Sequence, residues 1–238
     1  MKRDPTSLQA EELRIRDAYA RRQETGIYSR FNVGHLFMMQ EREQRFLRLL
    51  SVYNFTHLET KKILEIGCGS GGLLRDFVNW GANPENITGI DLLADRVNEA
   101  RRVCAANIQV DQGNAARLNL PDEHFDLVVQ STVFTSVLDS AMKKQMAGEM
   151  CRVLKPAGLI LWFDYHMNNP RNPDVKGVKA REIHALFPRC KIRLERITLA
   201  PPIARTIAPY SWLLCYLLSK VPWLCTHYVG VIRKDQLY

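Results

Sequence analysis

ILEIGCGSGG, the stretch from Ile63 to Gly72, decides the fold of this chain. The segment 62–66 is short and mostly apolar, so it predicts a buried strand, and the glycines after it permit a tight turn. A helix is expected directly after that turn, at 71–80. The start of such a helix presents free backbone N–H groups, which can hold a polar or anionic part of a ligand.

Downstream of this turn, expected strands alternate with expected helices. The strands are expected at 62–66, 86–91, 107–110, 125–130 and 159–164, and the helices at 71–80, 94–104 and 142–154, with LKPAG as the exit turn of the last helix. Strands separated by helices of this length form parallel βαβ units. Two later strands are expected at 191–199 and 226–233. We therefore predict an α/β fold, a Rossmann-like three-layer sandwich with a mostly parallel seven-stranded sheet and an antiparallel edge strand.

The glycines and one acidic residue predict a nucleoside-containing cofactor. Gly67, Gly69 and Gly72 fit the G-x-G-x-x-G pattern, which dinucleotide enzymes also carry. Asp91 lies 24 residues after Gly67, at the end of the next expected strand. A carboxylate there can accept hydrogen bonds from both ribose hydroxyls, or it can cap the helix that follows. Both interpretations of Asp91 are open at this point.

Five motifs between Lys61 and Asp164 resemble those of class I S-adenosylmethionine-dependent methyltransferases, in particular the UbiE-like, type 11 group. Glu65–Gly71 resembles the first motif, which places an acidic residue two positions before the first glycine. The dinucleotide fingerprint has no such residue. The other four motifs are resembled, in order, by GIDLLADRV (89–97), GNA (113–115), FDLVVQSTVF (125–134) and RVLKPAGLILW (152–162).

This resemblance implies S-adenosylmethionine as the cofactor and S-adenosylhomocysteine as its product. Glu65 is expected near the methionine ammonium, and Asp91 on the ribose hydroxyls. Asn114, where the family often has Asp, is expected to bond the adenine amino group through its side-chain carbonyl. Gln130 stands where many members of the family have Asn, Asp or a small residue. The residues implied to contact the cofactor are Glu65, Gly67, Cys68, Gly69, Asp91, Leu92, Asn114, Ala115, Gln130, Ser131, Tyr28 and Arg30.

Methyl transfer from a sulfonium requires an aligned acceptor and at most one base. The candidate catalytic residues are His166 and Tyr165, which follow the fifth expected strand, and His35, which precedes the core. His166 also fits a loop histidine bonded to backbone, and the aromatic residues around His35 also fit simple packing of a lid. No metal is expected, because the six cysteines have no metal-ligand spacing.

The 238 residues are expected to form a single methyltransferase domain with three parts. Residues 1–58 would be an N-terminal helical lid, with helices at 11–22 and 36–50. Residues 59–164 would be the cofactor-binding core. Residues 165–238 would be the substrate-side part, with an apolar insertion at 201–224. This insertion fits three interpretations: a core or dimer helix, the wall of an apolar acceptor pocket, or a peripheral membrane contact.

The net charge of +8 is concentrated in residues 165–238, which contain 12 Lys/Arg and 4 Asp/Glu. Such an excess indicates either a solvated basic face or an anionic partner. No RNA-binding module or basic-aromatic pattern accompanies it, so nucleic acid is not expected as a partner. The first residues lack the apolar region of a signal peptide, and the cysteines fit reduced thiols, so the predicted location is the cytoplasm.

The sequence therefore predicts an enzyme that methylates a small-molecule acceptor, apolar or anionic, in the biosynthesis of a natural product, glycan, quinone or lipid-linked intermediate. Oxygen is favoured as the acceptor atom because the [DN]PP[YFW] motif of amine methyltransferases is missing. Three alternatives stay open: a nucleic-acid methyltransferase, a non-catalytic S-adenosylmethionine-binding protein, and an NAD-dependent oxidoreductase. The acceptor and the oligomeric state are not predicted.

Overall fold

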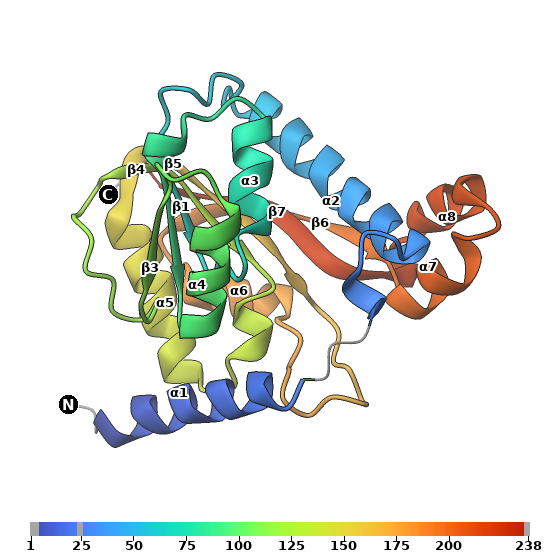
Figure 1. The fold of residues 1–238 in the computed structure, drawn as a ribbon, viewed down its shortest axis with the longest axis horizontal. Coiled ribbons are helices and arrows are strands. Elements are labelled where there is room, and N and C mark those ends of the chain that lie inside the picture. Colours follow the sequence, from blue (N-terminus) through green and yellow to red (C-terminus); the bar gives the residue numbers. More distant parts are fainter. Residues whose placement is uncertain (1–4, 23–25, 236–238) are drawn as a thin grey trace.

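A computed structural model describes residues 5–22 and 26–235 of the chain. Its seven strands form one sheet in the order β3-β2-β1-β4-β5-β7-β6 (Figure 1). In chain order they are β1 (Ile63–Ile66), β2 (Ile87–Asp91), β3 (Gln109–Gln112), β4 (Phe125–Ser131), β5 (Leu154–Tyr165), β6 (Cys190–Leu199) and β7 (Cys225–Lys234).

The first five strands are parallel, and β7 runs antiparallel to both of its neighbours, β5 and β6. The predicted Rossmann-like sheet is thus confirmed. Its antiparallel strand lies second from the edge, because β7 enters between β5 and β6. One side of β5 is already paired with β4. The chain that returns after β6 therefore pairs with the other side of β5, as β7.

Helices cover both faces of the sheet. Buried residues of α2 (Val33–Val52), α3 (Gly72–Asn79) and α4 (Ala94–Val103) share one core with one face. Buried residues of α1 (Pro5–Ala20), α5 (Ser140–Val153) and α6 (Ala180–Leu186) share a second core with the other face. Along β5, Leu159 and Leu161 belong to the first core while Ile160 and Trp162 belong to the second. This is the alternation that a strand buried on both sides requires.

The expected elements are present with small shifts of their bounds, and one local prediction was wrong. LKPAG does not form a separate turn, because β5 already begins at Leu154. Phe125 pairs with Leu154, and the next pair is Leu127 with Leu159, so the intervening residues form a bulge in β5. A bulge adds residues to one strand without ending the ladder, and sequence periodicity does not distinguish it from a turn.

The apolar insertion folds into α7 (Pro201–Ile207), α8 (Trp212–Ser219) and a 3-10 turn, η4 (Pro222–Leu224). Together with the first half of α2 they form a third, small apolar cluster that includes Phe37, Ala204 and Cys215. In Figure 1, α7 and α8 project from the body of the molecule. Within residues 5–22 and 26–235, no helix is both long and apolar enough to cross a membrane.

Candidate functional site

The glycine loop after β1 has a backbone that other residues adopt with difficulty. Gly67, Gly69 and Gly71 have φ values of 65°, 52° and 74°. Gly67 also has no room for a side chain, because an added Cβ would collide with Val133. The N–H groups of Gly67 and Cys68 donate to the carbonyl of Ile90, at 2.6 and 3.0 Å, which ties the loop to the end of β2. The glycines are therefore required by backbone conformation and close packing.

Asp91 ends β2 and faces this loop. Its Oδ2 accepts a hydrogen bond from the Gly69 N–H at 2.8 Å, and its Oδ1 accepts one from the Leu93 N–H at 2.9 Å. The carboxylate thus braces the glycine loop and the start of α4 together. The helix-capping interpretation and the ligand-binding interpretation are compatible here, because each carboxylate oxygen can accept a further hydrogen bond.

A cavity of about 750 Å³ opens at the ends of β1, β2 and β4. This volume suits a nucleoside-sized ligand. Predicted cofactor residues that line it are Tyr28, Glu65, Gly67, Cys68, Gly69, Asp91, Leu92, Asn114, Ala115 and Ser131. The wall also contains residues that sequence reasoning missed, from α1 (Ile15, Tyr19), α2 (Met39, Arg42) and α5 (Met142, Met146).

Glu65 is a buried carboxyl at the floor of the cavity. It is 3% exposed, and its Oε2 has no hydrogen-bond partner among the described residues. Burial raises the pKa of Glu65 well above its ordinary value, although the Arg42 guanidinium acts in the opposite direction. A buried polar atom without a partner is costly, so it marks a position where a ligand donor would be stabilising.

Arg42 of α2 lies beside Glu65. Its guanidinium donates to Ser131 Oγ at 3.3 Å and to Asp76 Oδ2 at 3.4 Å. The sequence held a signal for it, since Arg42 stands four residues from both Met38 and Phe46, which are buried on the apolar side of the same helix. A cation on the apolar face of a helix is unusual and needs a buried partner.

Asn114, the predicted adenine contact, is already held by the protein. Its Oδ1 accepts from the Ala116 N–H at 2.8 Å, and its Nδ2 donates to Glu12 Oε1 at 2.5 Å. The side chain lines the cavity, and it also links the loop after β3 to α1. Its predicted carbonyl-to-adenine bond would have to use the second lone pair of Oδ1.

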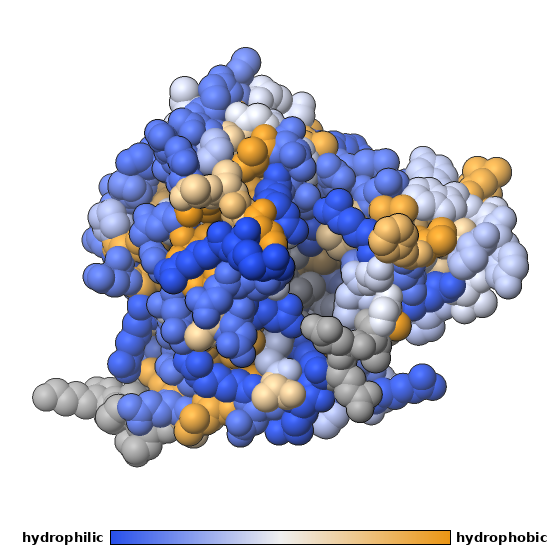
Figure 2. All heavy atoms as spheres, in the orientation of Figure 1, coloured by the Kyte–Doolittle hydropathy of each residue, from blue (hydrophilic) through white to orange (hydrophobic). Residues whose placement is uncertain are grey.

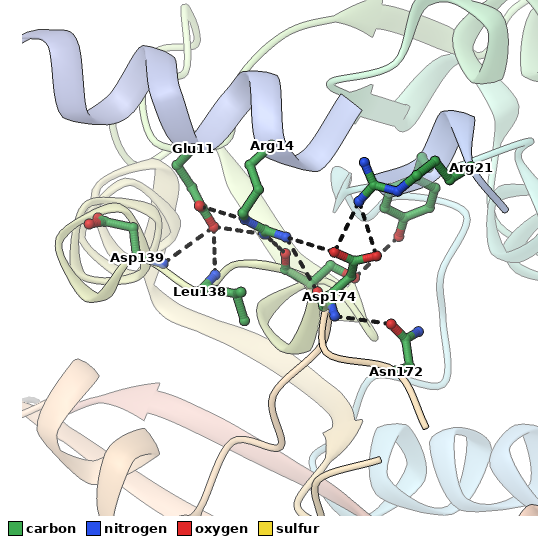
Figure 3. Close-up of polar contacts among 9 residues, drawn as sticks. Glu11, Arg14, Arg21, Leu138, Asp139, Asn172 and Asp174 are labelled. Atoms are coloured by element: carbon green, nitrogen blue, oxygen red, sulfur yellow. Dashed lines mark hydrogen bonds and ion pairs between the residues drawn. The ribbon is translucent and has the colours of Figure 1, made fainter. Parts of the chain in front are cut away.

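Charged side chains bind helix α1 to the segments that follow β4 and β5 (Figure 3). Glu11 accepts from the backbone N–H groups of Leu138, at 2.6 Å, and Asp139, at 3.3 Å. Arg14 donates to the Ser136 carbonyl at 2.6 Å. Burial acts to raise the pKa of Glu11, but hydrogen bonds from Arg14 and the two N–H groups outweigh it, so the pKa lies below its ordinary value.

A second contact that holds α1 in place lies just after its C-terminal end. Arg21 contacts Asp174 at 3.2 Å, and Asp174 belongs to the loop between β5 and α6 (Figure 3). Because Ile15 and Tyr19 of the same helix line the cavity, α1 forms one wall of the site.

Two predicted cofactor residues do not line the cavity. Gln130 is fully buried, where its Nε2 donates to the Phe163 carbonyl at 3.3 Å and its Oε1 accepts from the Val133 N–H at 3.2 Å. It thereby supports the segment that packs on Gly67. Arg30 is exposed and lies 3.7 Å from Asp76, outside this cavity.

None of the three predicted catalytic residues is among the described residues that line the cavity. His166 Nε2 is bonded to the Cys225 carbonyl at 3.0 Å, as its backbone-bonded interpretation proposed. Its ring packs on Tyr228, and its pKa is lowered, mainly by burial. The ring of Tyr165 packs on His227, and burial raises the pKa of Tyr165 to about 12.

His35 lies close to a lining residue. Its ring meets the Tyr28 ring edge-on, with centroids 5.9 Å apart, and Tyr28 lines the cavity. Burial lowers the pKa of His35, and the charges of Arg205 and Arg42 lower it further. The positive charge of Arg205, on α7, also acts to lower the pKa of Tyr165. The Arg205 Nε has no hydrogen-bond partner among the described residues. A polar group of Tyr28, His35, Tyr165 and Arg205 thus adjoins the cavity on the α7 side.

The comparisons with known proteins agree with this geometry. A family model described as a methyltransferase domain matches residues 63–158. A fatty-acid O-methyltransferase of Mycolicibacterium smegmatis is 37% identical over 114 residues, which are 45% of this chain and 38% of that protein. The ubiquinone/menaquinone biosynthesis C-methyltransferase UbiE of Ectopseudomonas mendocina is 32% identical over 121 residues, 47% of this chain and 44% of that protein. The chain thus spans about two fifths of the length of these curated relatives.

Solved structures share the fold over most of the chain. A S-adenosylmethionine-dependent methyltransferase from Archaeoglobus fulgidus superposes with a TM-score of 0.57 and 18% sequence identity. The match covers 84% of this chain and 98% of that one. At this identity the likeness shows the common fold.

Proposed function

We propose that this chain is a class I S-adenosylmethionine-dependent methyltransferase that methylates an oxygen of a small lipophilic acceptor. The observation that carries the proposal is the pairing of Asp91 with the glycine loop at the mouth of a cavity of about 750 Å³. When bound, S-adenosylmethionine supplies a methyl group that its sulfonium has already activated. The protein then has to bind the cofactor, orient the acceptor and, where needed, remove a proton from the acceptor.

The residues of the cavity fit this cofactor. Asp91 presents two acceptor oxygens that are fixed by backbone N–H groups, which suits a pair of ribose hydroxyls. The unpartnered Oε2 of Glu65 suits an ammonium donor. Leu92, Met142 and Met146 give the cavity an apolar wall that suits the adenine ring.

Glu65 would couple cofactor binding to a proton. Its raised pKa favours the protonated carboxyl while no ligand is bound. An ammonium group beside it would favour the carboxylate instead, so one proton would leave on binding. Affinity for the cofactor would accordingly rise with pH until Glu65 is ionised in the free protein.

We assign the base to His35 among the three predicted candidates. Its lowered pKa keeps the imidazole neutral, and so able to accept a proton, at neutral pH. Tyr165, with a pKa of about 12, stays protonated and can donate a hydrogen bond. His166 already uses Nε2 on the Cys225 carbonyl. Arg205 would orient an acceptor that carries negative charge or partial charge.

The names of the relatives support a lipophilic small molecule as the acceptor. One relative is a fatty-acid O-methyltransferase and the other a C-methyltransferase of quinone biosynthesis. The missing [DN]PP[YFW] motif favours oxygen over an amine. A fatty acid, a quinol or a lipid-linked intermediate would each combine an apolar body with one reactive oxygen.

Calorimetric titration with S-adenosylmethionine and S-adenosylhomocysteine, and with NAD as the control, tests the proposal. We expect both sulfur nucleosides to bind and NAD not to bind. Repeating the titration in two buffers of different ionisation enthalpy should reveal proton release on binding, which the Glu65→Gln variant should abolish. Binding of NAD alone would overturn the proposed activity. Binding without proton release would remove Glu65 from the ammonium site.

Turnover is then measured as formation of S-adenosylhomocysteine with fatty acids, quinols and, for comparison, transfer RNA. Methylation of an apolar acceptor that His35→Gln slows, with unchanged cofactor affinity, is the expected result. Turnover with RNA alone would favour the nucleic-acid alternative. Cofactor binding without turnover on any acceptor of this panel would favour a non-catalytic binding protein.

A further inference from the structure

The α7–α8 region exposes an unusual number of large apolar and aromatic side chains. We define the α8 surface as Tyr210, Leu213, Leu214, Tyr216, Leu217 and Trp223. Their exposed fractions include 69% for Leu213, 55% for Leu217 and 84% for Trp223. Figure 2 shows orange and pale residues on this protrusion, beside a body that is mostly blue in the same view. Contiguous apolar exposure of this kind marks an interaction surface.

The α8 helix is anchored by one side only. Cys215 and Ser219, one turn apart, are buried, and Trp212 meets Phe37 of α2 edge-on at 5.7 Å between ring centroids. Leu213 and Leu217, also one turn apart, lie on the opposite side and face outward. A surface helix normally carries polar residues on its outer side. In α8 the outer side is as apolar as the buried one.

The sequence segment that contains this surface carries only positive charges. From Arg196 to Lys234 the sequence contains no Asp or Glu, and it contains Arg205 and Lys220 next to the exposed side chains. The Lys220 ammonium lies 4.0 Å from the centre of the Tyr216 ring. Glu41 of α2 interacts with Ser219 on the buried side of α8, where burial raises the pKa of Glu41.

We propose that the α8 surface docks this protein onto an anionic lipid bilayer. Leucines would enter the outer part of the hydrocarbon region, and Trp223, Tyr210 and Tyr216 suit the interface between headgroups and acyl chains. The basic residues would meet anionic headgroups. The helix would lie in the interface rather than cross it, consistent with the absence of a spanning helix from the described residues.

The same charges argue against a second copy as the occupant. A two-fold dimer through the α8 surface would bring the basic rims of both copies together with no acidic residue of this segment to compensate. An anionic bilayer matches both the apolar centre and the basic rim, so it satisfies the two properties at once.

Docking would also place the acceptor side at the membrane, an extension that rests on the proposed function. The positive charge of Arg205 on α7 acts to lower the pKa of both His35 and Tyr165. The α7 and α2 helices pack closely there, since a Cβ on Gly34 would lie 2.5 Å from the Arg205 Cα. Because α7 packs against α8, docking through the α8 surface would hold Arg205 and the polar group beside the cavity close to the lipid headgroups.

Vesicle co-sedimentation of the full chain tests the docking directly. The probes are vesicles of phosphatidylcholine alone and of phosphatidylcholine mixed with phosphatidylglycerol. We expect binding to the mixed vesicles, weaker binding to the neutral ones, and loss of the difference at high salt. No cofactor or acceptor is present, so the outcome does not depend on the proposed methyl transfer.

A variant and a matched control distinguish binding through the α8 surface from non-specific hydrophobic binding. Leu213→Gln, Leu217→Gln and Trp223→Gln combined should weaken vesicle binding by about tenfold or more, because all three remove exposed apolar area. Leu47→Gln with Val52→Gln removes exposed apolar residues of α2 instead and should leave binding unchanged. Lys220→Glu should reduce the preference for anionic vesicles. Circular dichroism and S-adenosylmethionine titration verify that each variant is folded.

Two outcomes would overturn the proposal. Equal vesicle binding by the triple variant and the native chain would show that another surface is responsible. A dimer that the triple variant converts to a monomer, with no vesicle binding by either form, would show that a second copy covers the α8 surface. Light scattering after size-exclusion chromatography distinguishes these cases.

Discussion

The two halves of the sheet build their parts of the site in different ways. In the half formed by β1 to β4, the candidate cofactor residues Gly67, Asp91 and Asn114 each come from a short motif at or directly after the end of a strand. Asp91 follows β2 and reaches the loop that follows β1. In the half formed by β5 to β7, the candidate acceptor-side residues meet only through tertiary packing. His35, Tyr165 and Arg205 come from α2, β5 and α7. The candidate cofactor site can therefore be recognised from local sequence motifs, whereas the proposed acceptor site cannot.

The physical reason lies in the topology of the sheet. Parallel strands joined by right-handed crossovers all end at the same edge, so motifs after successive strands converge wherever the fold forms. No such rule governs the approach of α2 to α7, which depends on how two apolar helix faces fit one another. Three predictions, in order of decreasing expected effect, test this contrast.

The largest effect is expected at Gly67. The Gly67→Ala variant would place a Cβ against Val133 at a positive φ, and we expect a loss of about 3 kcal/mol or more in the free energy of unfolding. Gly72→Ala, at the first residue of α3, is the matched control, because Gly72 has open space around it and an ordinary φ. Its unfolding free energy should change by less than about 1 kcal/mol. Urea unfolding measures both values, and equal effects would refute the steric explanation.

The second effect concerns the proposed ribose contact of Asp91. Asp91→Ala removes the carboxylate that braces Gly69 and faces the cavity, so S-adenosylmethionine affinity should fall by about 1–3 kcal/mol. Asp95→Ala, which removes an exposed carboxylate in the first turn of α4, should leave the affinity unchanged. Calorimetric titration compares the two. An unchanged affinity in a folded Asp91→Ala protein would exclude the ribose role.

The third effect probes the other half of the sheet. Burial, together with the nearby His166 and Arg42, lowers the pKa of His227 to about 3. The unfolded chain protonates this histidine below about pH 6.5, while the folded chain keeps it neutral. His227 therefore leaves the free energy of unfolding unchanged above about pH 6.5 and lowers it progressively as the pH falls toward 3. At pH 5 the loss from His227 should be about 2 kcal/mol.

His227→Phe keeps an aromatic ring between Phe163 and Tyr165 and removes the titration. Between pH 7.5 and pH 5 this variant should lose less unfolding free energy than the native chain. His184→Gln alters an exposed histidine of α6 and should behave as the native chain does. If His227→Phe and the native chain show the same pH dependence, His227 is protonated in the folded state without cost.

Several features of the site were predictable because they depend on neighbours in the sequence. Alternating strands and helices predicted the sheet, and the glycines with Asp91 predicted a nucleoside-containing cofactor at the ends of β1 and β2. Asn114, Glu65 and Ser131 line the cavity as expected. Gln130 does not, because its position in a strand between two helix-covered faces turns its side chain into the interior, where backbone groups take both ends.

Other features needed the tertiary structure. Arg42 was missed because its partners Ser131 and Asp76 come from distant parts of the chain. The wall formed by α1 depends on ion pairs and hydrogen bonds to loops after β4 and β5. The sequence LKPAG fits a turn equally well, because only the strand pairing on both sides of it distinguishes a bulge from a turn.

By itself, then, the sequence determined the order of the elements, the parallel sheet, the glycine loop and the acidic residue that faces it. These properties follow from periodicity, from glycine's access to positive φ, and from the shared edge of parallel strands. The tertiary structure alone decided which helix closes the cavity, which polar residues gather beside it, and which side of α8 stays exposed. Those outcomes depend on packing between segments far apart in the chain, where the free energy belongs to the fit of two surfaces and not to either segment alone.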